Sequence, residues 1–323
     1  MASTRDIKNR IKSIGSTKKI TKAMEMVSAS KMRKAVEAVL RTRTYANLSW
    51  LTVLNLSQSM NGNNGELHQL LTPRKEIKKV GIILITSNRG LCGGFNAAII
   101  NKVQESIKKY QTIGERATVE AEFVLIGKKG AAIHHRGHTI VADFPKLDLA
   151  SEVNEIVPVA NLIIGEFISG KYDKVMVAYT DFVSSSKQIP RVKKLLPIEI
   201  DKADESLGIV GEDSRLGLDK KFVEEKEKQH AQSGQFTYEY TFEPSPEEVL
   251  NEMLPRLIEI QLYQALLESN ASEHSARMAA MHQATEAAGD MVSELTLSFN
   301  KARQAAITSE IAEISAGANA LAE

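Results

Sequence analysis

The sequence predicts an α/β protein in which an antiparallel coiled coil of two long terminal helices flanks one central domain with a mainly parallel sheet. Two observations predict this class. Near both ends of the chain, apolar residues recur every three or four positions, as on one face of a helix. In the middle, continuous apolar runs alternate with amphipathic stretches, as in strands joined by helices. The boundaries are placed at 1–60, 76–245 and 246–323.

The first segment is predicted to be a long basic helix. Residues 1–45 hold twelve Lys or Arg and three acids, about +9 in a chain whose net charge is +1. Gly15 weakens the helix, and Ser16 or Thr17 is expected to cap its resumption. The helix should reach about Leu56, roughly 75 Å at 1.5 Å per residue, too long for an ordinary domain helix. Its apolar stripe comprises Ile7, Ile11, Ile14, Ile20, Met24, Val27, Met32, Ala35 and Val39.

The middle segment is predicted to be a Rossmann-like α/β domain. Its apolar runs are those of strands buried on both faces. The expected strands are 80–86, 123–126, 174–179 and an alternating closing strand at 236–242. The expected helices are 96–110, 128–135 and 157–168. The stretch 201–232 is polar and rich in both charges, so it is predicted to be a surface excursion.

The last segment is predicted to be one helix from Ser245 to about Ala316. Ser245, Pro246 and Glu248 form an N-terminal signal with a capping box, and seventy helical residues would span about 105 Å. Such a helix cannot bury its stripe alone, and packing against the first helix is the simplest solution. Two separate bundles or a homo-oligomeric coil also fit the pattern. The stripe includes Met281, Ala288, Val292, Leu295, Phe299 and Ala302.

No motif predicts catalysis, a cofactor or a metal site. The glycine-rich loop after the first strand, 87–94, lacks the Lys-Ser/Thr pair of a nucleotide-binding P-loop, so a tight turn is the favoured interpretation. The histidine cluster 134–138 contains Arg136 and has no acidic or cysteine ligand at a suitable spacing. Cys92 is the only cysteine, which excludes a disulfide, and a buried small side chain is expected there.

Two surfaces of the terminal helices are predicted to bind partners. The basic face of the first helix suits phosphates, solvent or acidic protein loops, and it lacks the interleaved aromatic residues of a specific nucleic-acid binder. Near the other end of the chain, an apolar stripe continues where the opposite helix would already have ended, so a partner surface should enclose it. This stripe comprises Ile307, Thr308, Ile311, Ile314 and Leu321.

Three stretches resemble the gamma-subunit family of F-type ATP synthases of the bacterial type. They are IKSIGSTKKITKAMEMVSASKMRKA at 11–35, SNRGLCGGFN at 87–96, and the helix from Ala271 to Gly317 that contains NKARQAAITSEIAEISAG. The resemblance covers essentially the whole chain in the same order. One departure is Glu286-Ala287, where the family usually has Asp-Asn, so the resemblance implies no specific polar contact there.

The resemblance implies a rotating central shaft rather than an enzyme. The implied partners are the alpha and beta subunits, the epsilon subunit and the membrane c-ring, with no cofactor and no nucleic acid. Lys19, Lys22, Met24 and Arg33 match positions facing acidic loops of the beta subunits. Arg303, Gln304 and Thr308 match positions that engage the ring higher up, and Ile311 and Ile314 match the tip in its apolar bearing.

The implied location is the cytoplasmic face of the cell membrane, reached through partners. No stretch approaches eighteen consecutive apolar residues, and no signal or transit peptide is expected. A basic coiled-coil nucleic-acid-binding protein is the main alternative, and a small α/β enzyme with helical arms is a second one.

Overall fold

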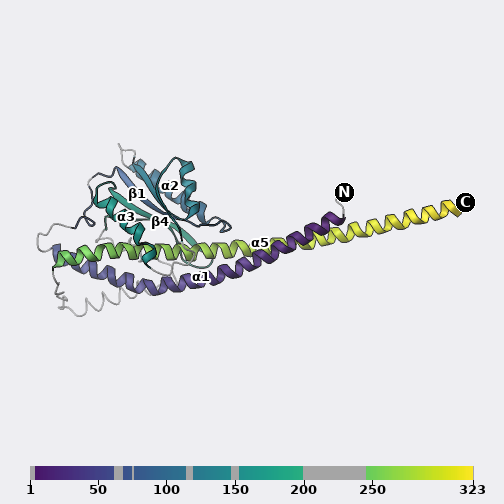
Figure 1. Cartoon of the computed structure of the whole chain (residues 1–323), viewed down its shortest axis with the longest axis horizontal. Coiled ribbons are helices and arrows are strands. Elements are labelled where there is room, and N and C mark those ends of the chain that lie inside the picture. The colour runs from purple at the N-terminus through teal and green to yellow at the C-terminus, as the bar shows by residue number, and fades with distance from the viewer. Residues whose placement is uncertain are drawn as a thin grey trace. The chain divides into compact units, whose positions relative to one another are not determined.

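The computed structural model describes residues 4–61, 68–74, 76–113, 119–146, 153–198 and 245–322 (Figure 1). The chain divides into two compact units, Met1–Ala29 with Arg277–Glu323, and Ser30–Ala276. Two long helices, α1 (Thr4–Asn61) and α5 (Pro246–Ala322), contribute residues to both units. In its described residues the first unit is therefore built from helix alone, and the sheet lies in the second.

The sheet of the second unit has five strands in the order β3-β2-β1-β4-β5. The first four are parallel to one another, and β5 is antiparallel to β4. The predicted mainly parallel sheet is thus confirmed. The strands are β1 (Lys79–Ile85), β2 (Glu120–Ile126), β3 (Thr139–Phe144), β4 (Lys174–Phe182) and β5 (Gln188–Leu196).

Helices cover both faces of this sheet, which explains why its central strands are apolar throughout. On one face, Ile82 of β1 packs in a core with Val103 of α2 (Phe95–Ile113). On the other face, Ile83 lies in a core with Ile163 of α3 (Val157–Ile168) and Leu262 of α5. The second unit is therefore three-layered, and α5 is part of its core.

The sequence located most elements of this unit and missed two strands. α3 spans the predicted range, and the predicted short helix is a 3-10 helix, η1 (Lys128–Arg136). The strands β3 and β5 and the short 3-10 helix η2 (Val153–Glu155) were not predicted. β5 contains a proline and three basic residues, so it has no continuous apolar run. The predicted strand at 236–242 and the excursion at 201–232 lie outside the described residues.

The expected interruption of the first helix is wrong, because α1 is continuous through Gly15 and extends past Leu56 to Asn61. The Ser16 and Thr17 hydroxyls donate to the carbonyl oxygens of Lys12 and Ser13, at 3.1 and 3.2 Å, inside the helix instead of capping a new one. At the start of α5, the expected cap is present. The Glu248 N–H donates to Ser245 Oγ at 3.2 Å.

Asp173 ties the start of β1 to the start of β4. Its Oδ2 accepts the backbone N–H groups of Lys78 and Lys79 at 2.8 and 3.0 Å, and its Oδ1 lies 3.4 Å from Arg74 Nη1. Burial alone would raise the pKa of this carboxyl. The two N–H groups and Arg74 outweigh the effect of burial and lower the pKa below the ordinary aspartate value of 3.8. A carboxyl with a depressed folded pKa stabilises the fold above its unfolded pKa, and this is lost as pH falls through the folded pKa.

Asp173→Asn is therefore expected to destabilise the chain by about 1–3 kcal/mol at pH 7, because one half-buried acceptor and its charge are lost. The difference from the unsubstituted chain should shrink in urea titrations near pH 3. Glu76→Gln is the matched control. It removes a carboxylate from an exposed pair with Lys78 and should change the free energy of unfolding by less than about 0.5 kcal/mol. A constant Asp173→Asn effect across this pH range would contradict the assignment.

Candidate functional site

The first unit is held together by a seam that repeats every seven residues on both helices. On α1, Thr21 and Ser28 are buried, and Ile7 lies at the same heptad position. On α5, Met281 and Ala288 are buried, and Leu295 is half-buried one heptad further on. A seven-residue repeat on two helices is the signature of coiled-coil packing. The small seam residues allow the helices to approach closely.

Contacts across the seam show that the helices run antiparallel. Thr285 Oγ1 donates to Thr21 Oγ1 at 2.8 Å, and His282 Nδ1 lies 3.3 Å from Glu25 Oε1. Three residues back along α5, the contact has moved four residues forward along α1. The predicted antiparallel coiled coil is therefore confirmed within the first unit.

The seam on α1 follows the predicted stripe only in part: Ile7 lies in it, but two other stripe residues do not. Ile20 is 60% exposed and Val27 is 55% exposed, while their neighbours Thr21 and Ser28 are buried. Placing Ile20 and Val27 in the seam was wrong, because hydrophobicity alone assigned them there. The seven-residue spacing of Ile7, Thr21 and Ser28 would have located it, although two of the three are polar.

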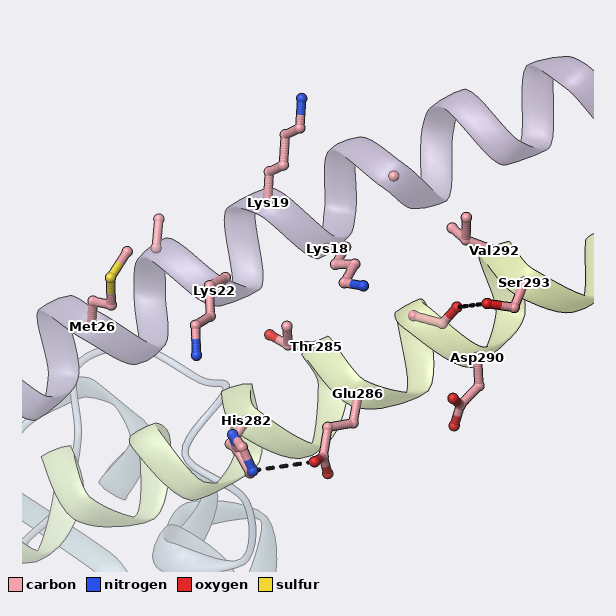
Figure 2. A pocket seen from close by; sticks show the side chains of 13 residues that line it. Lys18, Lys19, Lys22, Met26, His282, Thr285, Glu286, Asp290, Val292 and Ser293 are labelled. Carbon is pink, nitrogen blue, oxygen red and sulfur yellow. Dashed lines mark hydrogen bonds and ion pairs between the residues drawn. The ribbon is translucent and has the colours of Figure 1, made fainter. Parts of the chain in front are cut away.

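Charged residues surround the seam where α1 and α5 meet. Lys22 Nζ lies 3.0 Å from Glu25 Oε1. His282 Nε2 lies 3.4 Å from Glu286 Oε1, a pair marked in Figure 2. The hydrogen bond from Lys22 is the main cause that lowers the pKa of Glu25, and His282 contributes in the same direction against burial. Glu25 therefore stays ionised at neutral pH and links both helices.

The predicted basic contact residues differ in where they point. Figure 2 shows Lys19 pointing away from α5, whereas Lys18 and Lys22 point toward it. These three lysines line an open groove in the first unit together with His282 and residues of the next two turns of α5. Lys19 and Arg33 are exposed, and Met24 is half-buried. Lys19 is thus available to a partner without loss of a seam contact.

The last turns of α5 present an apolar surface. Ile307, Ile311 and Ile314 are 48%, 61% and 67% exposed, and Arg303, Gln304 and Thr308 are exposed as well. Arg303 lines a small groove with Thr4 and Phe299, so this is the level of α5 that lies beside the first described turn of α1. Three large exposed aliphatic side chains on one helix end are typical of a surface that a partner covers.

The other candidate sites have structural explanations. In the glycine-rich loop, Asn96 accepts the Ser87 N–H at 3.0 Å and donates to Ser87 Oγ at 2.7 Å, and Cys92 is buried as expected. In the histidine cluster, Arg136 donates to Gln104 at 2.6 Å, and burial against Phe123 lowers the pKa of His138. Within the described ranges, no group of three or more His, Cys, Asp or Glu is arranged to hold a metal ion.

The described helices lack membrane-spanning character. None of them combines the length and the low polarity needed to cross a bilayer.

Comparison with known proteins places the whole chain in one family. A family model described as ATP synthase matches residues 3–321. A protein of Chloroflexus aurantiacus named ATP synthase gamma chain is 40% identical over 322 residues, covering 99% of each chain. A protein of Legionella pneumophila with the same name is 36% identical over 322 residues, 99% of this chain and 100% of the relative.

A solved structure agrees with the fold. A chain in the OSCP, F1 and c-ring assembly of the Euglena gracilis mitochondrial ATP synthase matches with a TM-score of 0.61 and 16% identity. The match covers 98% of this chain and 94% of that one. At this identity the likeness concerns the fold alone, and the family rests on the sequence matches. The chain belongs to the ATP synthase gamma chain family.

Proposed function

We propose that the chain is the central-stalk rotor subunit of a proton- or sodium-translocating F-type ATP synthase. It transmits torque between the membrane c-ring and the catalytic ring of alpha and beta subunits, with the epsilon subunit as a further partner. It carries no catalytic site of its own. The main support is the full-length match to ATP synthase gamma chains, in a chain whose first unit is an antiparallel helix pair ending in an exposed apolar surface.

The surface of the helix pair suits a shaft that must turn against its surroundings. Exposed charge pairs contribute up to roughly 1 kcal/mol each, so a basic face attracts acidic loops and still releases them. Apolar side chains at the tip form no directional bonds and therefore do not lock at one angle. The residues proposed to contact the ring are Lys19, Lys22, Met24, Arg33, Arg303, Gln304, Thr308, Ile311 and Ile314.

The proposed location is the cytoplasmic face of the cell membrane, where the subunit is held by the c-ring. The Euglena assembly contains both F1 and the c-ring, which supports partners of these two kinds.

Co-expression with the alpha, beta and epsilon subunits of the same species tests this function. The chain should co-purify with them, and a probe attached to the second unit should rotate when the immobilised complex hydrolyses ATP. The isolated chain should not hydrolyse ATP. A chain that fails to join alpha and beta subunits, or a complex that hydrolyses ATP without rotation of this chain, would refute the proposal.

The same purified proteins separate the alternatives. The Chloroflexus and Legionella relatives are ATP synthase gamma chains, and they give the nucleic-acid-binding alternative no support. Steep salt-dependent binding of the isolated chain to DNA would favour that alternative. Stoichiometric nucleotide binding or turnover by the isolated chain would favour the small α/β enzyme.

A further inference from the structure

A buried ion pair connects α5 to the sheet of the second unit. Lys146 Nζ lies 2.6 Å from Glu273 Oε2, and the two side chains are 2% and 5% exposed. Lys146 follows β3, and Glu273 lies within α5. Burying two opposite charges is costly, and the geometry must be good for their attraction to offset it. Such a pair holds one rotational position of the helix more strictly than apolar contacts of the same area, which are non-directional.

The glycine-rich loop after β1 holds Lys146 in place. Asn88 Nδ2 donates to the Lys146 carbonyl oxygen, and Asn88 Oδ1 accepts the Lys128 N–H at 3.4 Å. The Lys146 ammonium lies 5.7 Å from the centre of the Phe95 ring, within the range of a cation–π contact. The polar groups of the loop are thus used to position the lysine that reaches α5.

The same turn of α5 is also hydrogen-bonded to strands β4 and β5 and the loop between them, at the opposite edge of the sheet from β3. Ser272 Oγ donates to the Thr180 carbonyl oxygen at 3.0 Å, and Ser275 Oγ donates to that of Ser185 at 2.7 Å. Gln188 Nε2 donates to Ser275 Oγ at 3.2 Å. Ser272 and Ser275 are both fully buried. Directional bonds from Lys146, just after β3, and from the β4–β5 hairpin therefore converge on residues 272–275.

We infer that residues 272–275 of α5 are the torque-bearing joint between the α/β domain and the shaft helix, with Lys146 and Glu273 as its ionic anchor. This rests on the proposed rotor function. Torque applied to the α/β domain is transmitted to α5 only if the helix cannot rotate about its own axis against the sheet and the segments that contact it. The apolar core around Leu262 resists separation of helix and sheet, and the polar bonds resist rotation of the helix about its own axis.

The test uses the whole ATP synthase in liposomes, with ATP hydrolysis and transport of the coupling ion, proton or sodium, measured together. Glu273→Gln should lower the number of coupling ions pumped per ATP at least threefold. Because it leaves Lys146 buried without its partner, it also destabilises the fold. The double variant Lys146→Met/Glu273→Leu removes both charges and retains the apolar volume, which is often neutral or stabilising. It should assemble normally and still pump at least threefold less per ATP.

Lys102→Met/Glu105→Leu is the matched control. It removes an exposed pair from α2, 3.5 Å apart, and should leave coupling unchanged. Ser275→Ala removes two hydrogen bonds with little change in volume and should lower the number of ions pumped per ATP at least twofold. If the double variant does not assemble, this variant tests the inference in its place.

A Lys146→Met/Glu273→Leu complex that assembles and pumps like the unsubstituted one would overturn the inference and assign the pair to stability alone. Unchanged coupling in Ser275→Ala, where the double variant cannot be assembled, would overturn it as well. Neither result would contradict the proposed rotor function. That proposal is refuted only if the unsubstituted chain does not join the ring and rotate.

Discussion

Replacing Gly127 by Ala is expected to destabilise the second unit by roughly 3–5 kcal/mol. Gly127 has φ 104° and ψ 134°, a conformation that side chains rarely adopt. A Cβ atom there would lie 2.3 Å from the Thr86 carbonyl oxygen, which is backbone and cannot move aside cheaply. The Gly127 N–H also donates to Phe144 at 3.1 Å, and its carbonyl accepts the Thr86 hydroxyl at 2.8 Å. Relief of the clash would break contacts between β1, β2 and β3.

Urea unfolding of the full-length chain, followed by circular dichroism, measures this effect. Gly137→Ala is the control, because Gly137 also has a positive φ, 85°, but nothing lies within 4 Å of its added Cβ. Its cost should stay near 1 kcal/mol, which is the strain of the backbone alone. Equal costs for the two variants would show that the close approach of Thr86 is not what requires glycine at 127.

Charge reversal at Lys19 and Arg33 is expected to lower ATP-driven rotation more than tenfold. Both residues are exposed, and Figure 2 shows Lys19 pointing away from α5, so the substitutions leave the seam intact. If acidic loops of the ring face these positions, the reversal turns attraction into like-charge repulsion, which costs several kcal/mol at an interface. Lys22→Glu is a poorer test, because it would place a second carboxylate beside Glu25.

Rotation of the immobilised complex under saturating ATP measures the effect of Lys19→Glu/Arg33→Glu. Lys108→Glu/Lys109→Glu applies the same charge change to the exposed end of α2 and should leave the rotation rate within about twofold of the unsubstituted complex. A basic face that is merely solvated would make both double variants behave alike. That outcome would remove Lys19 and Arg33 from the proposed contact set.

Local sequence determined the elements whose signal is periodic or continuous. The apolar run at 80–86 and the range 157–168 were correct because a buried strand and a buried helix each need apolar residues at a fixed local spacing. β5 was not predicted from the sequence, because most of its side chains are only half-buried and its neighbour β4 supplies the pairing. A strand of this kind depends on its partner more than on its own composition.

The sequence by itself determined two long helices around a mainly parallel α/β domain, a basic first helix and an apolar end, since these follow from composition and period along the chain. Only the tertiary structure decided that Thr21 and Ser28, not Ile20 and Val27, lie in the seam of α1, and which lysine reaches Glu273, 127 residues away. The physical reason is that close helix packing selects small side chains such as Thr21 and Ser28 over larger apolar ones. A buried ion pair likewise depends on two distant segments meeting, which no local pattern encodes.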